Sequence, residues 1–390
     1  MLCEKSQDSN VGSIAAEQSY LLDGYLMIKA LKLNNFRCFK EIELHNLRRV
    51  NVVVGKNAAG KTALLEAIKL GLDGLPATLP WLNQMRSILA FIPGPATAEI
   101  FQGLFRDFFY EFDTEKPIEI WMQDSAQQSA TLRVYFDAKR ATTIQMSMGF
   151  QKDLPSPNSL PSTIIPLAFE RSDFQEQKST LYATVDEDGK IFLEPAAKSL
   201  GVVSGFFSNS NFGNPPESAS WLSNLSVEKR SREVISAVQR HFPFIKELTS
   251  ESPILGLGAT VYADVDTLPR KLPLSLLSGG ISRLFAIMLA IVTFRGGAIL
   301  IDEIENGIFY DQYPMVWKTL IDLAEEHKTQ LFISTHSNEC LQALLPSIRG
   351  SENDFVLLRA ERENGVSHIA QFTGKEFEGA LAKGGEIRKP

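Results

Sequence analysis

The residues with the clearest chemical potential form a glycine-containing loop, Gly55-Lys56-Asn57-Ala58-Ala59-Gly60-Lys61-Thr62. Its two glycines let the backbone turn tightly and bring N–H groups close to an anion. The loop follows the apolar run Val50–Val54 and precedes a helical pattern over Ala63–Leu70, whose start attracts negative charge. This order predicts a phosphate site, in which Lys61 reaches the β- and γ-phosphates and the Thr62 hydroxyl coordinates Mg²⁺.

A second chemical pattern lies far along the chain, where two acids follow an apolar run. Residues Ala298–Ile301 lead directly into Asp302 and Glu303. In a nucleotide-binding sheet, the acid at the strand end holds the Mg²⁺ that Thr62 also approaches. The next acid orients and deprotonates an attacking water. The pattern is a weak signal alone, and it becomes a strong one behind a phosphate loop.

Two further patterns offer groups to an anion. Ser278-Gly279-Gly280 combines a hydroxyl, free N–H groups and a helix dipole, although a plain helix N-cap explains the same residues. His336 closely follows a second buried-strand pattern, Gln330–Ser334. A single histidine is usually structural, but this one falls where a group that senses the γ-phosphate is expected.

The elements that must position these residues alternate between strands and helices. An alternating pattern predicts a half-buried strand over Met27–Leu33, and Ile42 with Leu44 suggests another. Helices are predicted over Gly280–Thr293 and Gln312–His327, next to the strands that carry the acids and the histidine. This alternation predicts an α/β domain with a largely parallel sheet.

The middle of the chain has a different character. Ile118–Met122 and Thr131–Phe136 resemble antiparallel strands in their pattern. Residues 151–166 and 204–220 are rich in Pro, Ser or Asn and predict long loops. Apolar residues recur at helical spacing over Ser226–Leu248, which is typical of core packing.

These patterns suggest how the chain is divided. We expect one core from residues 27–74 and 256–390, and a β-rich lobe with a helical insertion from residues 75–255. Residues 1–26 lack a periodic apolar pattern, so we expect a poorly ordered N-terminal extension.

The composition is that of an ordinary globular protein. The chain has 390 residues, 44% hydrophobic and 22% charged, which suffices for a large core in two or more lobes. Its net charge of −7 argues against a generally basic nucleic-acid binder but leaves room for a local basic patch. No apolar run approaches the ~20 residues that cross a bilayer, and the first residues lack a secretory pattern. Cys3, Cys38 and Cys340 fit no metal-ligand spacing, so we expect reduced thiols and a cytoplasmic protein without a membrane partner.

The sequence resembles an ABC-type ATPase. The motifs that carry the resemblance are, in chain order, the phosphate loop, Leu277-Ser278-Gly279-Gly280, the Asp302-Glu303 pair and His336. Narrower segments resemble its RecF, SMC and OLD-type branch, namely Leu33-Asn34-Asn35-Phe36-Arg37-Cys38-Phe39, Ile301-Asp302-Glu303-Ile304-Glu305-Asn306-Gly307 and Ser334-Thr335-His336-Ser337. The end Gly385-Glu386-Ile387-Arg388 is similar to that of small stand-alone AAA family ATP-binding proteins of this kind. The resemblance covers residues 27–74 and 256–345, and no motif covers the middle.

The resemblance implies a fold and partners. The fold is an α/β ABC-type ATPase head, with a P-loop parallel sheet, an antiparallel β lobe and a mostly helical insertion. The implied cofactors are ATP and Mg²⁺. The implied assembly is a homodimer in which two ATP molecules lie between two heads.

The resemblance also implies roles for single residues. One loop holds the phosphates of ATP, through Gly55, Lys56, Asn57, Ala58, Ala59, Gly60, Lys61 and Thr62. Thr62 and Asp302 hold Mg²⁺, Glu303 is the general base, and His336 contacts the γ-phosphate. The site of a second subunit is completed by Ser278, Gly279 and Gly280. Arg37 contacts nucleotide phosphate from the same chain, and Gln102 is the candidate for a glutamine near the metal and the attacking water.

Three features depart from the family pattern. Ile281 stands where relatives often have Gln or Glu, so we expect fewer polar contacts at that corner. Ile308-Phe309-Tyr310 stands where relatives often have Leu-His-Pro, so the subunit-crossing loop differs. The sequence continues only briefly after the predicted ATPase core, so we expect no Toprim nuclease domain of the kind found in full OLD-type proteins.

Two roles of different class fit an ATPase that pairs head to head on ATP. In the first, it is a sensor or scaffold for a separate effector, such as a nuclease or toxin in phage defence. In the second, it binds DNA in repair or recombination, as RecF-like proteins do. Residues 75–255 contain no Lys/Arg run longer than two, and phosphate contacts need clustered positive charge. The sequence therefore favours the first role, and a membrane transporter component is the weakest alternative.

Overall fold

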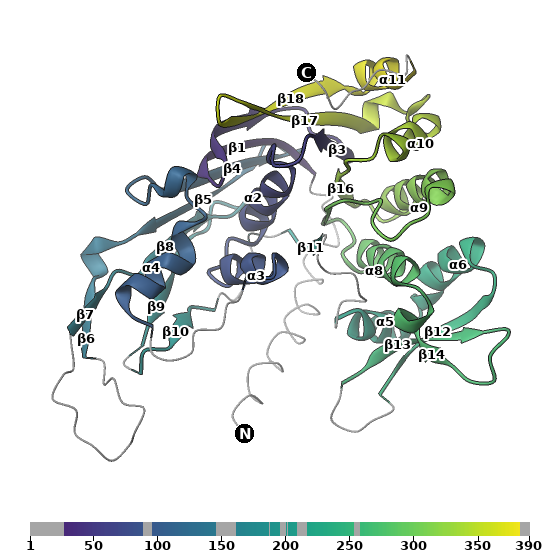
Figure 1. The fold of residues 1–390 in the computed structure, drawn as a ribbon, viewed down its shortest axis with the longest axis horizontal. Coiled ribbons are helices and arrows are strands. Elements are labelled where there is room, and N and C mark those ends of the chain that lie inside the picture. The colour runs from purple at the N-terminus through teal and green to yellow at the C-terminus, as the bar shows by residue number, and fades with distance from the viewer. Residues whose placement is uncertain are drawn as a thin grey trace.

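A computed structural model of this chain describes residues 27–88, 96–145, 161–186, 188–195, 200, 202–208, 217–252 and 258–382. The predicted extension over residues 1–26 and the segment Gly385–Arg388 lie outside the described residues. Two large sheets lie on either side of helix α2 (Lys61–Asp73), and further helices cover the far side of the second sheet (Figure 1).

The first sheet has seven antiparallel strands in the order β10-β9-β8-β5-β4-β1-β2. In that order the strands are Ile191–Leu193, Lys178–Val185, Leu167–Ser172, Ser129–Phe136, Ile118–Asp124, Ile28–Phe36 and Phe39–Leu44. In β4 alternate residues from Ile118 to Asp124 are buried, so one face of the sheet packs inward. The predicted antiparallel pairing of the strands at 118 and 131 is confirmed.

The second sheet has six strands in the order β11-β15-β16-β3-β17-β18. They span Ser204–Phe207, Ala298–Ile301, Gln330–Ser334, Val50–Gly55, Phe355–Glu363 and Val366–Thr373. Every pair from β11 to β17 is parallel, and β18 returns antiparallel to β17, so the predicted largely parallel sheet is confirmed. Parallel order brings the carboxyl ends of β3, β15 and β16 to one edge, where the phosphate loop, the acids and His336 follow.

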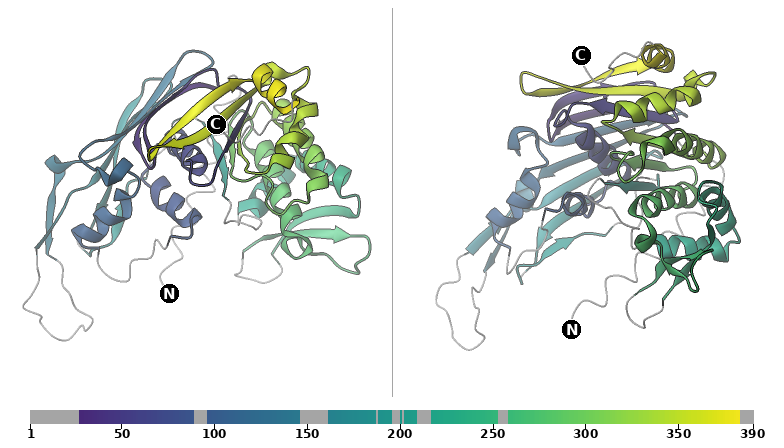
Figure 2. Two further views of the ribbon diagram at one scale, coloured as in Figure 1. Left: turned by 45° about the horizontal axis from the view of Figure 1, so that its top comes forward. Right: turned by 45° about the vertical axis from the view of Figure 1, so that its right-hand side comes forward.

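The layers follow from alternating side chains in the buried strands. Val50, Val52 and Val54 of β3 join a core with α8 (Gly279–Thr293), α9 (Tyr313–Glu326), α10 (Asn338–Ile348) and α11 (Gly374–Ala382). Val53 points the other way, into a core shared with α2 and the antiparallel sheet. Figure 2 shows the β17–β18 hairpin over the first sheet, and the Gln371 side chain bonds the backbone of His45 there. Each face of the central sheet is therefore covered.

The remaining elements connect or flank these layers. The helices are α3 (Thr78–Met85), α4 (Ala98–Arg106), α5 (Glu217–Val227), α6 (Ser231–His241) and α7 (Leu274–Leu277). A three-stranded sheet is formed by β12 (Ile245–Glu251), β13 (Thr260–Val265) and β14 (Leu272–Pro273), and a hairpin by β6 (Thr142–Gln145) and β7 (Pro161–Ile164). Short 3₁₀ turns lie at Tyr110–Phe112, Ala138–Arg140, Tyr310–Gln312 and Glu352–Asp354. Among the helices described, none has the length and apolar character needed to cross a membrane.

The prediction of a loop over residues 204–220 is wrong at both ends. Ser204–Phe207 forms strand β11 beside β15, and helix α5 begins at Glu217. The Phe207 carbonyl accepts the N–H of Asp302 at 2.8 Å, so this edge strand supports the acid. Its four residues are too few for a periodic signal, and only pairing with β15 makes them a strand.

The helical pattern over Ser226–Leu248 also predicts the wrong element at its end. Helix α6 ends at His241, and strand β12 begins at Ile245. Ile245 and Leu248 are buried, but they face the core from a strand and not from a helix. The pairing of β12 with β13 shifts register between Ile245 and Glu247, so residues three positions apart can lie on the same face of the strand. The division of the chain into a core and a lobe stays a prediction, although β11 joins the core sheet from inside residues 75–255.

Candidate active site

The phosphate loop has the backbone shape that its glycines predict. Gly55 and Gly60 have φ values of 142° and 113°, in the region that favours glycine. A Cβ on Gly55 would meet the Ala360 carbonyl oxygen at 2.2 Å, and one on Gly60 would meet the Phe39 ring at 2.7 Å. The loop is thus pressed against β17 and β2, and helix α2 begins directly after it at Lys61. Its N–H groups and the helix start form a cradle that suits phosphate oxygens.

Lys61 lies in this cradle and bonds the loop itself. Its ammonium donates to the carbonyls of Gly55 at 2.9 Å and Lys56 at 3.1 Å. Burial lowers the pKa of Lys61, while the negative charges of Asp302, Glu303 and Glu305 act in the opposite direction. A phosphate entering the cradle can take over these donors and restore the charge partner that burial demands.

Asp302 and Thr62 meet as the sequence predicts. The Thr62 hydroxyl donates to one oxygen of Asp302 at 2.8 Å, and the Ser334 hydroxyl donates to the other at 2.5 Å. Burial raises the pKa of Asp302, which these two hydrogen bonds oppose. A hydroxyl and a carboxylate oxygen side by side are hard oxygen ligands, so the pair fits Mg²⁺, whose charge would keep the carboxylate ionised.

Glu303 has a strained backbone at the position predicted for the base. Its φ is 53°, a left-handed value that is uncommon for a residue with a side chain. Its N–H donates to the Ser334 hydroxyl at 2.8 Å, and its carboxylate accepts from the Asn306 amide at 2.8 Å. Ser334 therefore positions both acids, one through its oxygen as acceptor and one through its proton.

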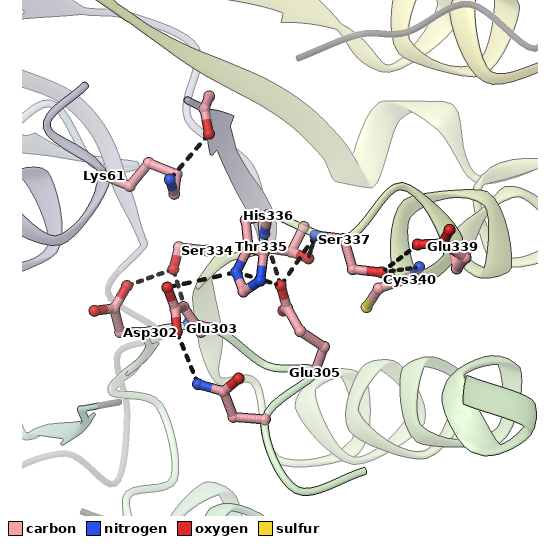
Figure 3. A network of polar contacts seen from close by, with 12 residues as sticks. Lys61, Asp302, Glu303, Glu305, Ser334, Thr335, His336, Ser337, Glu339 and Cys340 are labelled. Carbon is pink, nitrogen blue, oxygen red and sulfur yellow. Dashed lines mark hydrogen bonds and ion pairs between the residues drawn. The ribbon is translucent and has the colours of Figure 1, made fainter. Parts of the chain in front are cut away.

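His336 joins the acids through Glu305 (Figure 3). Its Nδ1 lies 3.0 Å from a Glu305 oxygen and 3.4 Å from a Glu303 oxygen. The same Glu305 oxygen accepts the backbone N–H groups of His336 at 2.7 Å and Ser337 at 3.0 Å. The buried Glu305 thus holds the loop after β16, and the half-exposed ring of His336 stays beside the predicted base.

The signature Ser278-Gly279-Gly280 forms the start of helix α8. The Ser278 hydroxyl accepts the N–H of Ile281 at 3.4 Å, so the plain N-cap interpretation holds for this state of the chain. Arg283, buried one turn later, donates to the Asp302 carbonyl at 2.6 Å. Burial lowers the pKa of Arg283, and the charge of Asp302 opposes this. The signature helix is therefore tied directly to the strand end that carries the acids.

Gly280 makes a second contact, with the loop that follows Asp302 and Glu303. A Cβ at Gly280 would lie 1.8 Å from the carbonyl oxygen of Gly307, whose own φ is 76°. We expect Gly280→Ala to lower the free energy of unfolding by about 1–3 kcal/mol, because two backbones must separate. Denaturant unfolding measures this.

The control for this change is Gly379→Ala in helix α11, where a Cβ would meet nothing within 4 Å. Alanine favours a helix over glycine, so we expect the control to be neutral or stabilising. Equal stability of the Gly280→Ala protein and the unchanged protein would contradict the close backbone approach.

A cavity of about 650 Å³ opens at the phosphate loop. Of the predicted site residues it is lined by Asn57, Ala58, Gly60, Lys61, Thr62, Glu303 and Arg37. It is also lined by residues that the sequence analysis did not assign, including Arg86, Phe109, Tyr110, Glu111, Phe112 and Arg362. Its volume and mixed polar and aromatic walls suit a nucleotide.

Arg37 reaches this cavity from the turn between β1 and β2. Its φ is 52°, its Nε donates to Glu66 at 3.2 Å, and its guanidinium lies 4.0 Å from the centre of the Phe108 ring. Burial lowers the pKa of Arg37, while the charge of Glu66 raises it. The structure therefore places Arg37 at the wall of this cavity, and its contact with a nucleotide phosphate stays a prediction.

Gln102 does not line this cavity. It lies half-buried on α4, whose buried side chains Phe101 and Phe105 turn the helix toward the first sheet. Helix α4 packs against α3 and β7. Gln102 thus lies outside the described wall of the cavity that holds Thr62 and Glu303, and its contact with the metal stays a prediction.

Sequence reasoning left out several supporting residues. Glu305 and Ser334 lay inside recognised motifs, and their buried-strand neighbours were the signal that could have marked them. Arg86 and Arg362 come from segments without a motif, and nothing local distinguishes them from surface arginines.

Comparisons with known proteins indicate the family of the chain. The family model of the AAA ATPase domain matches residues 27–212 and 218–341. A Helicobacter pylori protein named ATP/GTP phosphatase is 24% identical over 359 residues, which cover 84% of this chain and 90% of that protein. The DNA replication and repair protein RecF of Idiomarina loihiensis is 44% identical over 45 residues, 12% of this chain and 13% of RecF.

Among solved structures, the SMC head bound to the C-winged helix domain of ScpA covers 89% of this chain and 98% of its own, with a TM-score of 0.47 and 14% identity. The SMC head domain from Thermotoga maritima covers 88% and 98%, with a TM-score of 0.40 and 12% identity. These scores are low, and the conclusion depends on the family match and on the sheet and site described above. The chain belongs to the AAA ATPase domain family and is an ATPase.

Proposed function

We propose that this ATPase uses Mg²⁺ and hydrolyses ATP between two paired copies of the chain, and that it acts as a sensor or scaffold for a separate effector. The observation that carries the chemistry is the 2.8 Å contact between Thr62 and Asp302, with Glu303 next to it and Lys61 in the same cavity. Bound Mg²⁺ would be held by Thr62 and Asp302 and would neutralise phosphate charge.

The residues of the chain divide the work of hydrolysis. The N–H groups of the phosphate loop and Lys61 hold the phosphates, and Arg37 adds a contact from the same side. Glu303 takes a proton as the water oxygen bonds to the γ-phosphorus. His336 lies beside this carboxylate, and we propose that its ring donates to the γ-phosphate.

Pairing of two copies is supported by the surface around the signature. Ser278 begins α8 at a point where three large apolar side chains are exposed: Leu276 by 75%, Phe309 by 61% and Tyr310 by 63%. The Gly280–Gly307 contact brings the segments that carry them together. Apolar groups gathered in this way favour a protein partner, and a second copy would bring its phosphate loop to Ser278.

The choice of role depends on charge. The net charge of −7 and the short basic runs of residues 75–255 disfavour contacts with a DNA backbone. The RecF match is the specific observation for the second candidate, an ATP-dependent DNA-binding protein in repair or recombination. We therefore place effector docking first, with phage defence as one setting for it.

A binding assay separates these two candidates. We expect Glu303→Gln protein with ATP to show no submicromolar affinity for duplex DNA at moderate salt, because few phosphate contacts are available. We expect it to co-purify with the product of a neighbouring gene when the two are expressed together. Fluorescence anisotropy with labelled DNA provides the measurement, and submicromolar, ATP-dependent DNA binding by the isolated ATPase would overturn the effector role.

A further inference from the structure

The buried carboxylate of Glu66, next to the nucleotide cavity, accepts hydrogen bonds from two arginines. Glu66 lies on α2, one turn after the phosphate loop, and is 1% exposed. Arg86 donates to it twice, from Nε at 2.5 Å and from Nη2 at 3.0 Å, and Arg37 donates from Nε at 3.2 Å. A forked pair of this kind sets the direction of the guanidinium as well as its charge.

Both arginines line the cavity that also contains Lys61, Thr62 and Glu303. The remaining donors of Arg37 point to the Asp107 carbonyl and the Asn83 side chain, at 3.3 and 3.4 Å. For Arg86, no hydrogen bond from Nη1 is found within the described part of the chain, and its side chain is 38% exposed. Glu66 therefore holds the guanidinium of Arg86 in place, and Nη1 of this guanidinium can donate a hydrogen bond into the cavity.

The charges around Arg86 indicate the kind of group that it could contact. Arg37, Arg86 and Glu66 together carry one more positive than negative charge and can attract the phosphates of a nucleotide, although Asp107, Glu111 and Glu303 also line the cavity. During hydrolysis the bond from the γ-phosphorus to the β-phosphate oxygen breaks, and its electron pair passes to ADP as negative charge. A positioned arginine stabilises charge that develops in this way more strongly than a mobile one.

We propose that Arg86 is a catalytic residue that contacts the terminal phosphates of ATP bound in its own chain, and that Glu66 positions it. The inference rests on the nucleotide site of the proposed function and is independent of pairing, effector and DNA. It goes beyond Arg37, because Arg86 comes from the end of α3 and from no recognised motif.

The test compares turnover with binding for Arg86→Ala and Glu66→Gln. We expect Arg86→Ala to lower kcat by about 10²–10³-fold, within the range for a lost transition-state donor or arginine finger. The Kd of ATP, measured by calorimetry in the Glu303→Gln background, should change by less than about fivefold. Guanidinium ion at millimolar concentration should restore part of the lost turnover. Glu66→Gln should lower kcat by roughly tenfold, and guanidinium should not restore it.

Controls separate this outcome from other failures. Arg349→Ala removes an exposed arginine that forms a surface ion pair with Glu378, and it should leave kcat unchanged. Glu66 keeps Arg37 in the Arg86→Ala protein, so folding should survive, and Arg86→Gln replaces that variant if melting shows otherwise. Turnover within threefold of the unchanged protein, or an equal loss of affinity and kcat, would overturn the inference. An unchanged protein with no ATPase activity would instead reject the proposed function.

Discussion

Lys61→Ala is expected to weaken ATP binding by at least about a hundredfold, which corresponds to roughly 2.8 kcal/mol. The ammonium of Lys61 is buried and donates to the carbonyls of Gly55 and Lys56, so a bound phosphate would give it a charge partner. Removing it leaves the phosphates without the cation that faces them. Isothermal titration calorimetry with ATP and Mg²⁺ measures the loss.

The matched control for this change is Lys318→Ala. Lys318 lies on α9 with an exposed side chain and a surface ion pair to Asp322, and such pairs contribute little. We expect its ATP affinity to equal that of the unchanged protein. Full ATP affinity of the Lys61→Ala protein would contradict the phosphate site.

Glu303→Gln is expected to lower ATP hydrolysis by about 10²–10⁴-fold while ATP still binds. Glutamine keeps the size of the side chain and an acceptor for the Asn306 amide, but it cannot take the proton of the attacking water. Single-turnover hydrolysis of radiolabelled ATP measures the chemical step directly. Undiminished turnover would show that another group is the base.

The same variant tests pairing. With ATP bound and not consumed, we expect a dimer to accumulate, and light scattering reports its mass. Ser278→Arg in the Glu303→Gln background is the control, because a large side chain at the signature crowds the partner's γ-phosphate. A monomer with and without ATP would count against ATP-driven pairing, and loss of the dimer on adding Ser278→Arg would support contact through the signature.

Part of this site could be predicted because its signals are local. The glycines of the phosphate loop have a backbone requirement that few other residues meet, and the run Ala298–Ile301 is apolar because both faces of its strand are buried. Parallel strands end at one edge, so Thr62, Asp302 and His336 could be expected together before any distance was known.

Gln102 shows what such local signals leave open. It was chosen from its neighbours in the sequence, but Phe101 and Phe105 bury the other side of α4 and hold Gln102 outside the cavity wall. The loop predicted where β11 lies is wrong for a related reason, because these four residues become a strand only when β15 pairs with them.

The sequence by itself predicted the chemistry: a loop for phosphate, an acid for a metal, an acid for water and a signature for a second copy. Each depends on neighbours within one turn or one strand, so its pattern survives in the linear order. Only the tertiary structure decided which residues support that chemistry. Glu66 meets Arg86, Glu305 meets His336 and Gly280 meets Gly307 because packed layers bring distant segments into contact. Side chains separated by many residues leave no periodic trace of such contacts in a single sequence.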